Sequence, residues 1–499
     1  MKAAAKKICL CILFLAILCL TAGFFFRAFT PDEGNFVLPK GFYKKDSDRF
    51  DVLFAGTSKI KQGVYPMVLY KEFGISSYNL GTGDQTAALS YYLLKDAIAR
   101  QHPRLVVLEV GMGDYNTTYE GTEDVHYITD NMPFFSPSRY ELISGIEKEG
   151  EDSLRFLFPW YEYHSRWTSL SESDVVHEDS GTAYGSWVLA QSKNSGYFDP
   201  CDPDPSWDLP EVVTEYLEKT ILLCEETDTQ LVLLTLPVFG PGLLTADLYP
   251  QRISEAYAIE QFANAHGIPC LNLIAETRHL GLNAETDTLD GLHLNMAGAE
   301  KFSAFLGKTL QETYALPDRR GDTDYAFVEE DYGKYMSYRT RQILQTDNRA
   351  ATYFAHLIET YDTEDYLYVL TAAGDTTVSM TEVVMQGLRD MGLSHIDAAA
   401  GNHPYIAVVD RGNVAYETSD FSLTSDFLED TISGVSVTAL SRNAEEGSGA
   451  QAILDLNNYV LQGPGLNIVI YDKAAGKKVD ACYVIADAAG GGIAHGLPE

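Results

Sequence analysis

Basic residues are scarce in this chain: 36 lysines and arginines stand against 71 aspartates and glutamates over 499 residues, a formal net charge of −35. Such a charge repels polyanions, so the sequence argues against nucleic acid as a partner. Cysteine is sparse too, with seven residues and no CxxC or metal-type spacing among Cys201, Cys224, Cys270 and Cys482. We therefore predict no dense disulfide framework, no metal and no cofactor.

Charge is also absent from one long run at the amino terminus, Ile8–Phe26, which follows Lys2, Lys6 and Lys7. A helix rises ~1.5 Å per residue, so this run could span a hydrocarbon core of ~30 Å. Lysines before such a run favour a cytoplasmic start. We therefore expect residues 1–30 to be a single-pass membrane anchor, with the remaining domains extracytoplasmic at the cell membrane. A cleaved signal peptide is the alternative.

Short apolar runs then alternate with helical patterns, as in sheets of parallel strands. The alternation predicts an α/β domain over residues 31–315, a doubly wound five-stranded parallel sheet of the flavodoxin-like kind. The expected strands lie in the runs 49–56, 76–81, 104–111, 229–237 and 268–274.

Three further segments depart from this rhythm. Residues 114–208 are rich in aromatics, proline, serine and aspartate, and we interpret them as an insertion over the carboxyl ends of the strands. A charged, partly helical linker is expected over 316–349. It leads to a β-rich, sandwich-like domain over 350–487, and the glycine-rich residues 488–499 are expected to form a flexible tail.

One candidate constellation joins two distant segments. Ser58 follows an apolar run in "VLFAGTSKIKQG", and Asp290 and His293 lie three residues apart before a helical pattern. A serine hydroxyl needs an adjacent base to act as a nucleophile, and an imidazole base needs an acceptor on its other nitrogen. Both segments are expected at the carboxyl edge of the sheet, so the sequence predicts a Ser58–His293–Asp290 triad.

These motifs resemble the SGNH/GDSL hydrolase superfamily over roughly residues 51–310. Gly56-Thr57-Ser58 matches the first block, Gly81 the second and Asp290–His293 the last. The combination of "GTS" with "HLNMAGAEKF" is similar to the membrane-anchored branch that includes DltD-like D-alanyl transfer proteins and polysaccharide O-acetylation proteins. The resemblance implies an oxyanion hole built from the backbone N–H groups of Ser58 and Gly81.

The third block departs from the family pattern, because Gly113 stands where an oxyanion-binding asparagine is expected. Asn116 or Gln85 is a candidate replacement donor. Lys59, His164 and Arg166 are candidate cleft residues. The alternatives are a solvated lysine and an aromatic-packed structural turn. Residues 350–487 resemble the ILEI/PANDER-type domain, which implies a non-catalytic module.

Together these features predict a membrane-tethered serine acyl esterase or acyltransferase. Its expected partner is a cell-surface polysaccharide or teichoic-acid-like glycan, carrying an acetyl or similar ester. Transfer, as opposed to hydrolysis, would imply a membrane O-acyltransferase partner. The alternative is a non-catalytic glycan-binding or cell-envelope assembly protein that retains the fold.

Overall fold

The computed structural model describes residues 2–31, 34–111, 113, 115–148, 152–170, 196–360, 366–377, 379–461, 465–486 and 491–496. It divides into two compact units, Met1–Tyr335 and Met336–Glu499. The first unit therefore extends beyond the predicted boundary at residue 315, and the second begins before residue 350.

The first unit is built on a five-stranded sheet in which every neighbouring pair is parallel, with strand order β2-β1-β3-β4-β5. At its centre, Leu53 of β1 is in register with Tyr78 of β2 and Val106 of β3. The fold class is confirmed, since each predicted apolar run contains one strand. The strands are β1 (Val52–Ala55), β2 (Ser77–Asn79), β3 (Leu105–Glu109), β4 (Gln230–Thr235) and β5 (Cys270–Asn272).

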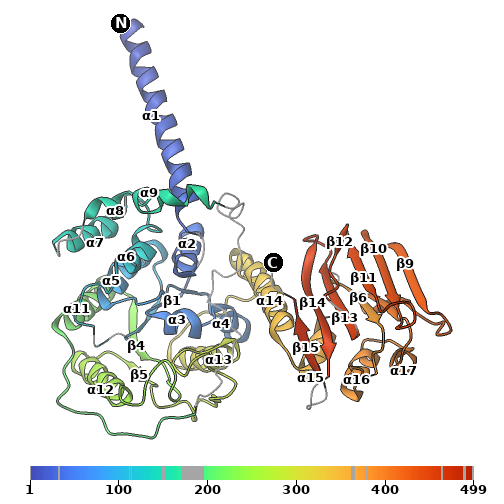
Figure 1. The fold of residues 1–499 in the computed structure, drawn as a ribbon. Helices are drawn as coiled ribbons and strands as arrows, with labels where there is room; N and C mark the ends of the chain where they lie inside the picture. The colour runs from blue at the N-terminus through green and yellow to red at the C-terminus, as the bar shows by residue number, and fades with distance from the viewer. Residues whose placement is uncertain are drawn as a thin grey trace. The chain divides into compact units, whose positions relative to one another are not determined.

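Helices cover this sheet in two groups, as Figure 1 shows. One group comprises α3 (Ser58–Gly63), α4 (Pro66–Phe73) and α13 (Met296–Thr313), where α13 contacts the other two. The other comprises α5 (Ala87–Gln101) and α11 (Glu211–Glu226), which contact each other. Helix α12 (Tyr249–His266) contacts β4 and β5. Parallel strands with such crossovers place all five carboxyl ends at one edge of the sheet.

The amino-terminal segment forms α1 (Lys2–Phe29), followed by η1 (Gly34–Phe36) and α2 (Val37–Lys44). Within the part of the chain that the structure describes, no helix is both long enough and apolar enough to cross a membrane. The predicted single-pass anchor at residues 1–30, and the cell-membrane location that depended on it, are therefore wrong.

The predicted insertion, where it is described, contains short helices between residues 122 and 168 and has no helix or strand over residues 196–208. Its buried face includes Val125, Leu142 and Phe156, each essentially inaccessible to solvent. Residues 114, 149–151 and 171–195 lie outside the described residues. The helices are α6 (Thr122–Thr129), α7 (Pro137–Lys148), α8 (Ser153–Leu157), α9 (Trp160–Tyr163) and η2 (His164–Thr168).

The predicted linker is mostly helix: η4 (Thr323–Tyr325) is followed by α14 (Ala326–Thr346), which crosses the boundary between the two units. The second unit continues with α15 (Ala350–Thr360), α16 (Glu382–Asp390) and α17 (Ile396–Ala399). Its strands are β6 (Tyr366–Ala373), β7 (Ile406–Asp410), β8 (Asn413–Glu417), β9 (Ser425–Ile432), β10 (Val435–Arg442), β11 (Ala450–Leu454), β12 (Asn457–Asn458), β13 (Gly465–Asp472), β14 (Lys477–Ile485) and β15 (Gly492–His495).

Two hydrophobic cores hold the second unit together. Leu367 and Val369 of β6 pack with Val437 of β10 in one of these cores. On the opposite side of β6, Tyr368 and Leu370 pack against residues of α15 and α16. Strands β6 and β10 are joined by a single bridge, from Ala373 to Arg442. Among the described residues, the strands of this unit form one ten-stranded sheet, which confirms the predicted β-rich character.

The end of the chain differs from the prediction. Residues 492–495, expected within a flexible tail, form β15 and pair antiparallel with β14. Val484 faces Ile493 in this ladder, and both side chains are buried. Backbone pairing and apolar burial together order a glycine-rich segment whose composition alone favours disorder.

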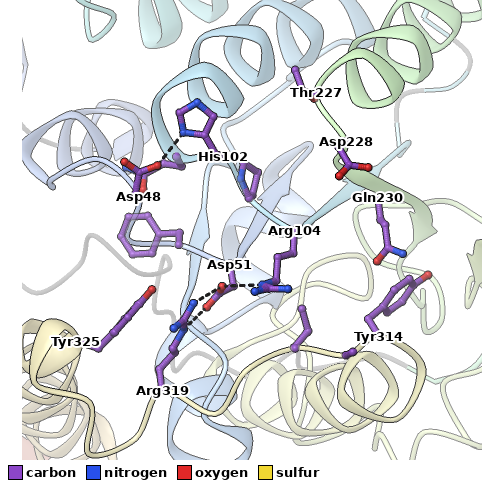
Figure 2. Close-up of a pocket in the computed structure, with 15 residues that line it drawn as sticks. Asp48, Asp51, His102, Arg104, Thr227, Asp228, Gln230, Tyr314, Arg319 and Tyr325 are labelled. Atoms are coloured by element: carbon purple, nitrogen blue, oxygen red, sulfur yellow. Dashed lines mark hydrogen bonds and ion pairs between the residues drawn. The ribbon is translucent and has the colours of Figure 1, made fainter.

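A cavity of about 660 Å³ lies at the amino edge of the first sheet (Figure 2). Asp51 and Arg104, which line it, directly precede the sheet residues Val52 and Leu105. The buried Asp51 carboxylate accepts two hydrogen bonds from the Arg319 guanidinium, at 2.7 and 2.8 Å, and Arg104 lies 3.5 Å away. This pair ties the segment after α13 to the start of β1, at the edge opposite Ser58.

Arg319→Ala should lower the free energy of unfolding by roughly 1–3 kcal/mol, because it leaves the buried Asp51 carboxylate with only the longer contact to Arg104. Urea unfolding monitored by tryptophan fluorescence measures this loss. Arg320→Ala is the matched control: it breaks an exposed ion pair with Asp318 and exposed hydrogen bonds to the carbonyls of Lys71 and Glu72, so we expect a much smaller change. Equal losses in both variants would contradict the prediction.

Candidate active site

Ser58 lies in a tight turn between β1 and α3. The turn begins at Gly56, whose φ of +146° is strained for any residue with a side chain. Thr57 then caps α3, because its hydroxyl accepts a hydrogen bond from the N–H of Lys59 at 3.3 Å. Ser58 is the first residue of the helix, and the structure describes no acceptor for its N–H.

The structure brings together all three residues of the predicted triad. Ser58 Oγ lies 2.8 Å from His293 Nε2, and His293 Nδ1 lies 2.8 Å from Asp290 Oδ2. A carboxylate can only accept, so the ring proton is on Nδ1 and Nε2 is left to accept from the serine hydroxyl. The geometry matches a nucleophile, a base and an orienting carboxylate.

The loop that carries Asp290 and His293 is held at both ends. Asp290 Oδ1 accepts hydrogen bonds from the N–H groups of Leu292 (2.9 Å) and His293 (2.8 Å). Burial raises the pKa of Asp290, but the hydrogen bond with the His293 ring, these backbone bonds and the charge of His293 outweigh burial, so the pKa lies below the usual range. Thr288 donates to the carbonyl oxygen of His293 at 2.7 Å. The carboxylate is therefore ionised and fixed toward the imidazole.

The "LNMAGAEKF" segment has a structural role in this loop. Asn295 caps α13 by accepting from the N–H of Gly298 at 3.1 Å, and its amide donates to the carbonyl of Thr286 at 2.8 Å. Lys301 forms an ion pair with the buried Asp287 at 2.6 Å. A side chain at residue 298 would collide with the backbone of Asp287. The motif thus fixes the loop to the helix that follows it.

Glu109, at the end of β3, contacts the residues on both sides of Ser58 in the turn between β1 and α3. Its Oε2 accepts from both the N–H and the hydroxyl of Thr57, each at 2.9 Å, and its Oε1 lies 3.1 Å from Lys59 Nζ. The Glu109 side chain is fully buried and that of Lys59 is 10% exposed. Lys59, predicted as a cleft residue, is therefore engaged in a buried ion pair. Both neighbours of Ser58 are held by one carboxylate.

The predicted oxyanion donors differ in whether they already have a hydrogen-bond acceptor. The N–H of Gly81 donates to Asn79 Oδ1 at 2.9 Å, so the structure does not support Gly81 as a free second donor. Gln85 is buried, and its Oε1 accepts from the N–H of Thr82 at 3.0 Å. Its Nε2 is buried with no partner among the described residues. Of the donors close to the second block, Gln85 Nε2 therefore has no acceptor among the described residues, but no described contact joins Gln85 to Ser58.

Other predicted residues are not brought to Ser58 by any described contact. Asn116 is exposed in the loop before α6. His164 is exposed and contacts the carbonyl of Tyr161, and Arg166 donates to the carbonyl of Phe29 at 2.6 Å. Gly113 donates to Glu255 at 2.6 Å, and a side chain there would crowd Glu255. Met112 and Asp114 of the third block lie outside the described residues.

Sequence reasoning missed Glu109 and Asn79. Glu109 is the single charge in the apolar run "RLVVLEVG" after its first residue, and an unexplained charge at the end of a buried strand is a usable signal. Asn79 is fully buried, and its amide donates to the carbonyls of Ile60 and Val64, each at 2.8 Å. Asn79 thereby holds α3 against the end of β2.

No known sequence family matches the chain, and no curated protein matches it. Among solved structures it is similar to a GDSL-like lipase from Bacteroides thetaiotaomicron (13% identity, TM-score 0.27, 53% of this chain and 88% of that one). It is also similar to a lipase/acylhydrolase from Enterococcus faecalis (13%, 0.26, 55% and 100%) and to an acetylxylan esterase, Axe2, from Geobacillus stearothermophilus (14%, 0.27, 53% and 94%). These similarities are too low to indicate a reaction or substrate.

Two carboxylates follow the second and third strands in sequence, Asp84 and Asp124. Asp124 accepts a hydrogen bond from the N–H of Gly121 at 2.8 Å. Burial, and then the charge of Asp84, raise the pKa of Asp124 to about 7. Because its folded pKa exceeds the unfolded value of about 3.9, the stability from Asp124 is complete below about pH 4. It is lost as the pH rises to about 7.

Asp124→Asn should therefore raise the melting temperature at pH 8 and have a smaller effect at pH 5, since asparagine keeps the acceptor for Gly121 without the charge. Scanning calorimetry at both pH values measures the difference. Asp84→Asn removes the second cause of the raised pKa and should give a smaller gain of the same sign. A gain in melting temperature that is equal at pH 5 and pH 8 would show that the pKa of Asp124 is not raised.

Proposed function

We propose that this protein is a serine-dependent acyl esterase or O-acyltransferase. The observation that carries the proposal is the hydrogen-bonded series Ser58 Oγ–His293 Nε2–Asp290 Oδ2, with 2.8 Å at each step. These contacts join residues 235 positions apart in the sequence. A binding protein has no need for a base and an oriented carboxylate beside a serine at the start of a helix.

In the proposed first half-reaction, His293 Nε2 takes the hydroxyl proton as Ser58 Oγ attacks an ester carbonyl. The carbon–oxygen π pair moves to the carbonyl oxygen, and the N–H of Ser58 faces the resulting charge, with Gln85 Nε2 as a second candidate donor. Collapse expels the alcohol, which receives the proton from His293. Asp290 stabilises the imidazolium throughout. The product is an acyl group on Ser58.

In the second half-reaction, water or an alcohol loses its proton to His293 and attacks the acyl carbonyl. Ser58 leaves with the proton returned from the imidazolium. Water as acceptor makes the protein an esterase, and a sugar hydroxyl makes it a transferase. In a transferase, a partner enzyme would supply the acyl donor.

We propose a glycan ester, acetyl or similar, on a cell-surface polysaccharide as the substrate. The support for this is the resemblance of the "GTS" and "HLNMAGAEKF" segments to O-acetylation and D-alanyl transfer proteins. A net charge of −35 favours a neutral or cationic ester over a polyanionic one, unless the site provides local compensation.

Ser58→Ala should abolish turnover of p-nitrophenyl acetate, by roughly 10⁴-fold or more, and labelling by a fluorophosphonate probe. The probe reacts when Ser58 Oγ bonds to phosphorus and fluoride leaves. Ser77→Ala is the matched control, because Ser77 is a buried serine of β2 whose hydroxyl has no partner among the described residues. Labelling lost in both variants, or retained in Ser58→Ala, would contradict the proposal.

Glu109→Gln should lower kcat by about tenfold or more with little change in KM, because it leaves the buried Lys59 charge uncompensated beneath the turn. The double variant Glu109→Gln/Lys59→Gln removes both charges and should recover part of the loss. Esterase kinetics with p-nitrophenyl acetate separate the two constants. No recovery in the double variant would show that the ion pair does not position Ser58.

A further inference from the structure

The second unit contains a buried group of metal-ligating side chains that the proposed reaction does not use. Among the described residues, a single group of three such side chains has all its ligand atoms within 4.8 Å of one another: Asp480, Cys482 and His495. Asp480 and Cys482 are on β14 and His495 is on β15. The side chains of His495 and Asp480 are 14% and 5% exposed, and Cys482 is 1% exposed.

The two strands place these side chains together. Asp480 and Cys482 are two residues apart on one strand, so both point to the same face. Cys482 is the ladder partner of His495, which brings the imidazole beside them. His495 Nδ1 lies 3.1 Å from the nearer Asp480 oxygen. The donors are one thiol, one carboxylate and one imidazole nitrogen, a combination that suits zinc.

A second shell of contacts already orients two of these ligands. The other ring nitrogen of His495, Nε2, donates to the carbonyl oxygen of Asp347 at 3.0 Å. Tyr353 of α15 donates to Asp480 Oδ2 at 2.9 Å, and its oxygen lies 3.1 Å from Cys482 Sγ. Zinc-bound histidines ordinarily make such a bond to a carbonyl, and zinc-bound carboxylates are themselves hydrogen-bonded. The outer contacts of a metal site are thus in place.

We propose that Asp480, Cys482 and His495 bind one Zn²⁺ ion in the second unit. Tetrahedral zinc with bonds of 2.0–2.3 Å separates its ligands by about 3.3–3.8 Å. His495 Nδ1 and Asp480 Oδ2, which lie 3.1 Å apart, would therefore move apart by only a few tenths of an ångström, and all three ligand atoms already lie within 4.8 Å of one another. A water molecule would be the fourth ligand. Binding replaces the thiol proton of Cys482 and the proton on His495 Nδ1, and both pass to solvent. The ion would link β14 and β15 to each other and, through Tyr353, to α15.

The first test measures zinc directly on the purified full chain. After dialysis against metal-free buffer, Zn²⁺ is added, excess is removed, and the metal is quantified by mass spectrometry. We expect one zinc per chain. Cys482→Ser and His495→Gln should each weaken binding by more than about 100-fold, beyond the loss usual for a second-shell change. Cys224→Ser is the matched control, because it changes a buried cysteine of α11 and should leave zinc binding intact.

Cobalt gives a second readout that does not depend on variant folding. Co²⁺ added to the wild-type chain should produce a thiolate-to-cobalt charge-transfer band and the visible absorption of tetrahedral coordination. Zn²⁺ should then displace both signals. Tyr353→Phe should keep the bands and weaken binding by about tenfold, since it removes only an outer contact.

The proposal is overturned if folded wild-type protein binds no zinc in stoichiometric amount and gives no charge-transfer band. The cluster would then be a closed hydrogen-bond network in which Tyr353 and His495 donate to Asp480. It is also overturned if zinc binding survives both Cys482→Ser and His495→Gln, because the metal would then be bound elsewhere.

Discussion

The position of Ser58 in the candidate site depends on the buried carboxylate of Glu109. A strand that ends in a glycine at φ +146° has little intrinsic preference for presenting a serine at the start of a helix. Glu109 compensates by accepting two hydrogen bonds from Thr57, directly before Ser58, and by lying beside Lys59, directly after it. An unpaired charge at this depth would be strongly destabilising, so the lysine and the carboxylate stabilise each other as well as the turn.

The other half of the site is rigid for a different reason. Asp290 and His293 belong to one loop in which the carboxylate satisfies two backbone N–H groups and the imidazole at the same time. Thr288 and Asn295 close the loop on either side. Base and orienting group therefore move together, and only one distance, from His293 to Ser58, has to be set by the packing of α13 against α3 and α4.

The sheet could be predicted because buried parallel strands leave continuous apolar runs separated by helical periodicity. The residues that would form the triad could be predicted because serine, aspartate and histidine stood at strand and helix ends in the right order. The oxyanion donors could not, since the use of Gly81 depends on where the Asn79 side chain points, and local sequence does not determine this. Composition also misjudged 492–495, because composition does not show that this segment can pair with β14, the strand directly before it.

The space around Glu109 also limits how the sequence can change. A Cβ atom at Gly56 would come within 2.7 Å of Glu109, and one at Gly111 would come within 1.8 Å of its Oε1 and 2.6 Å of Lys59 Nζ. Positions 56, 59, 109 and 111 are consequently coupled: neither glycine can acquire a side chain unless Glu109 or Lys59 moves. Related chains should carry either all four residues or a different solution beneath the serine, and this would distinguish lineages that the short "GTS" motif cannot.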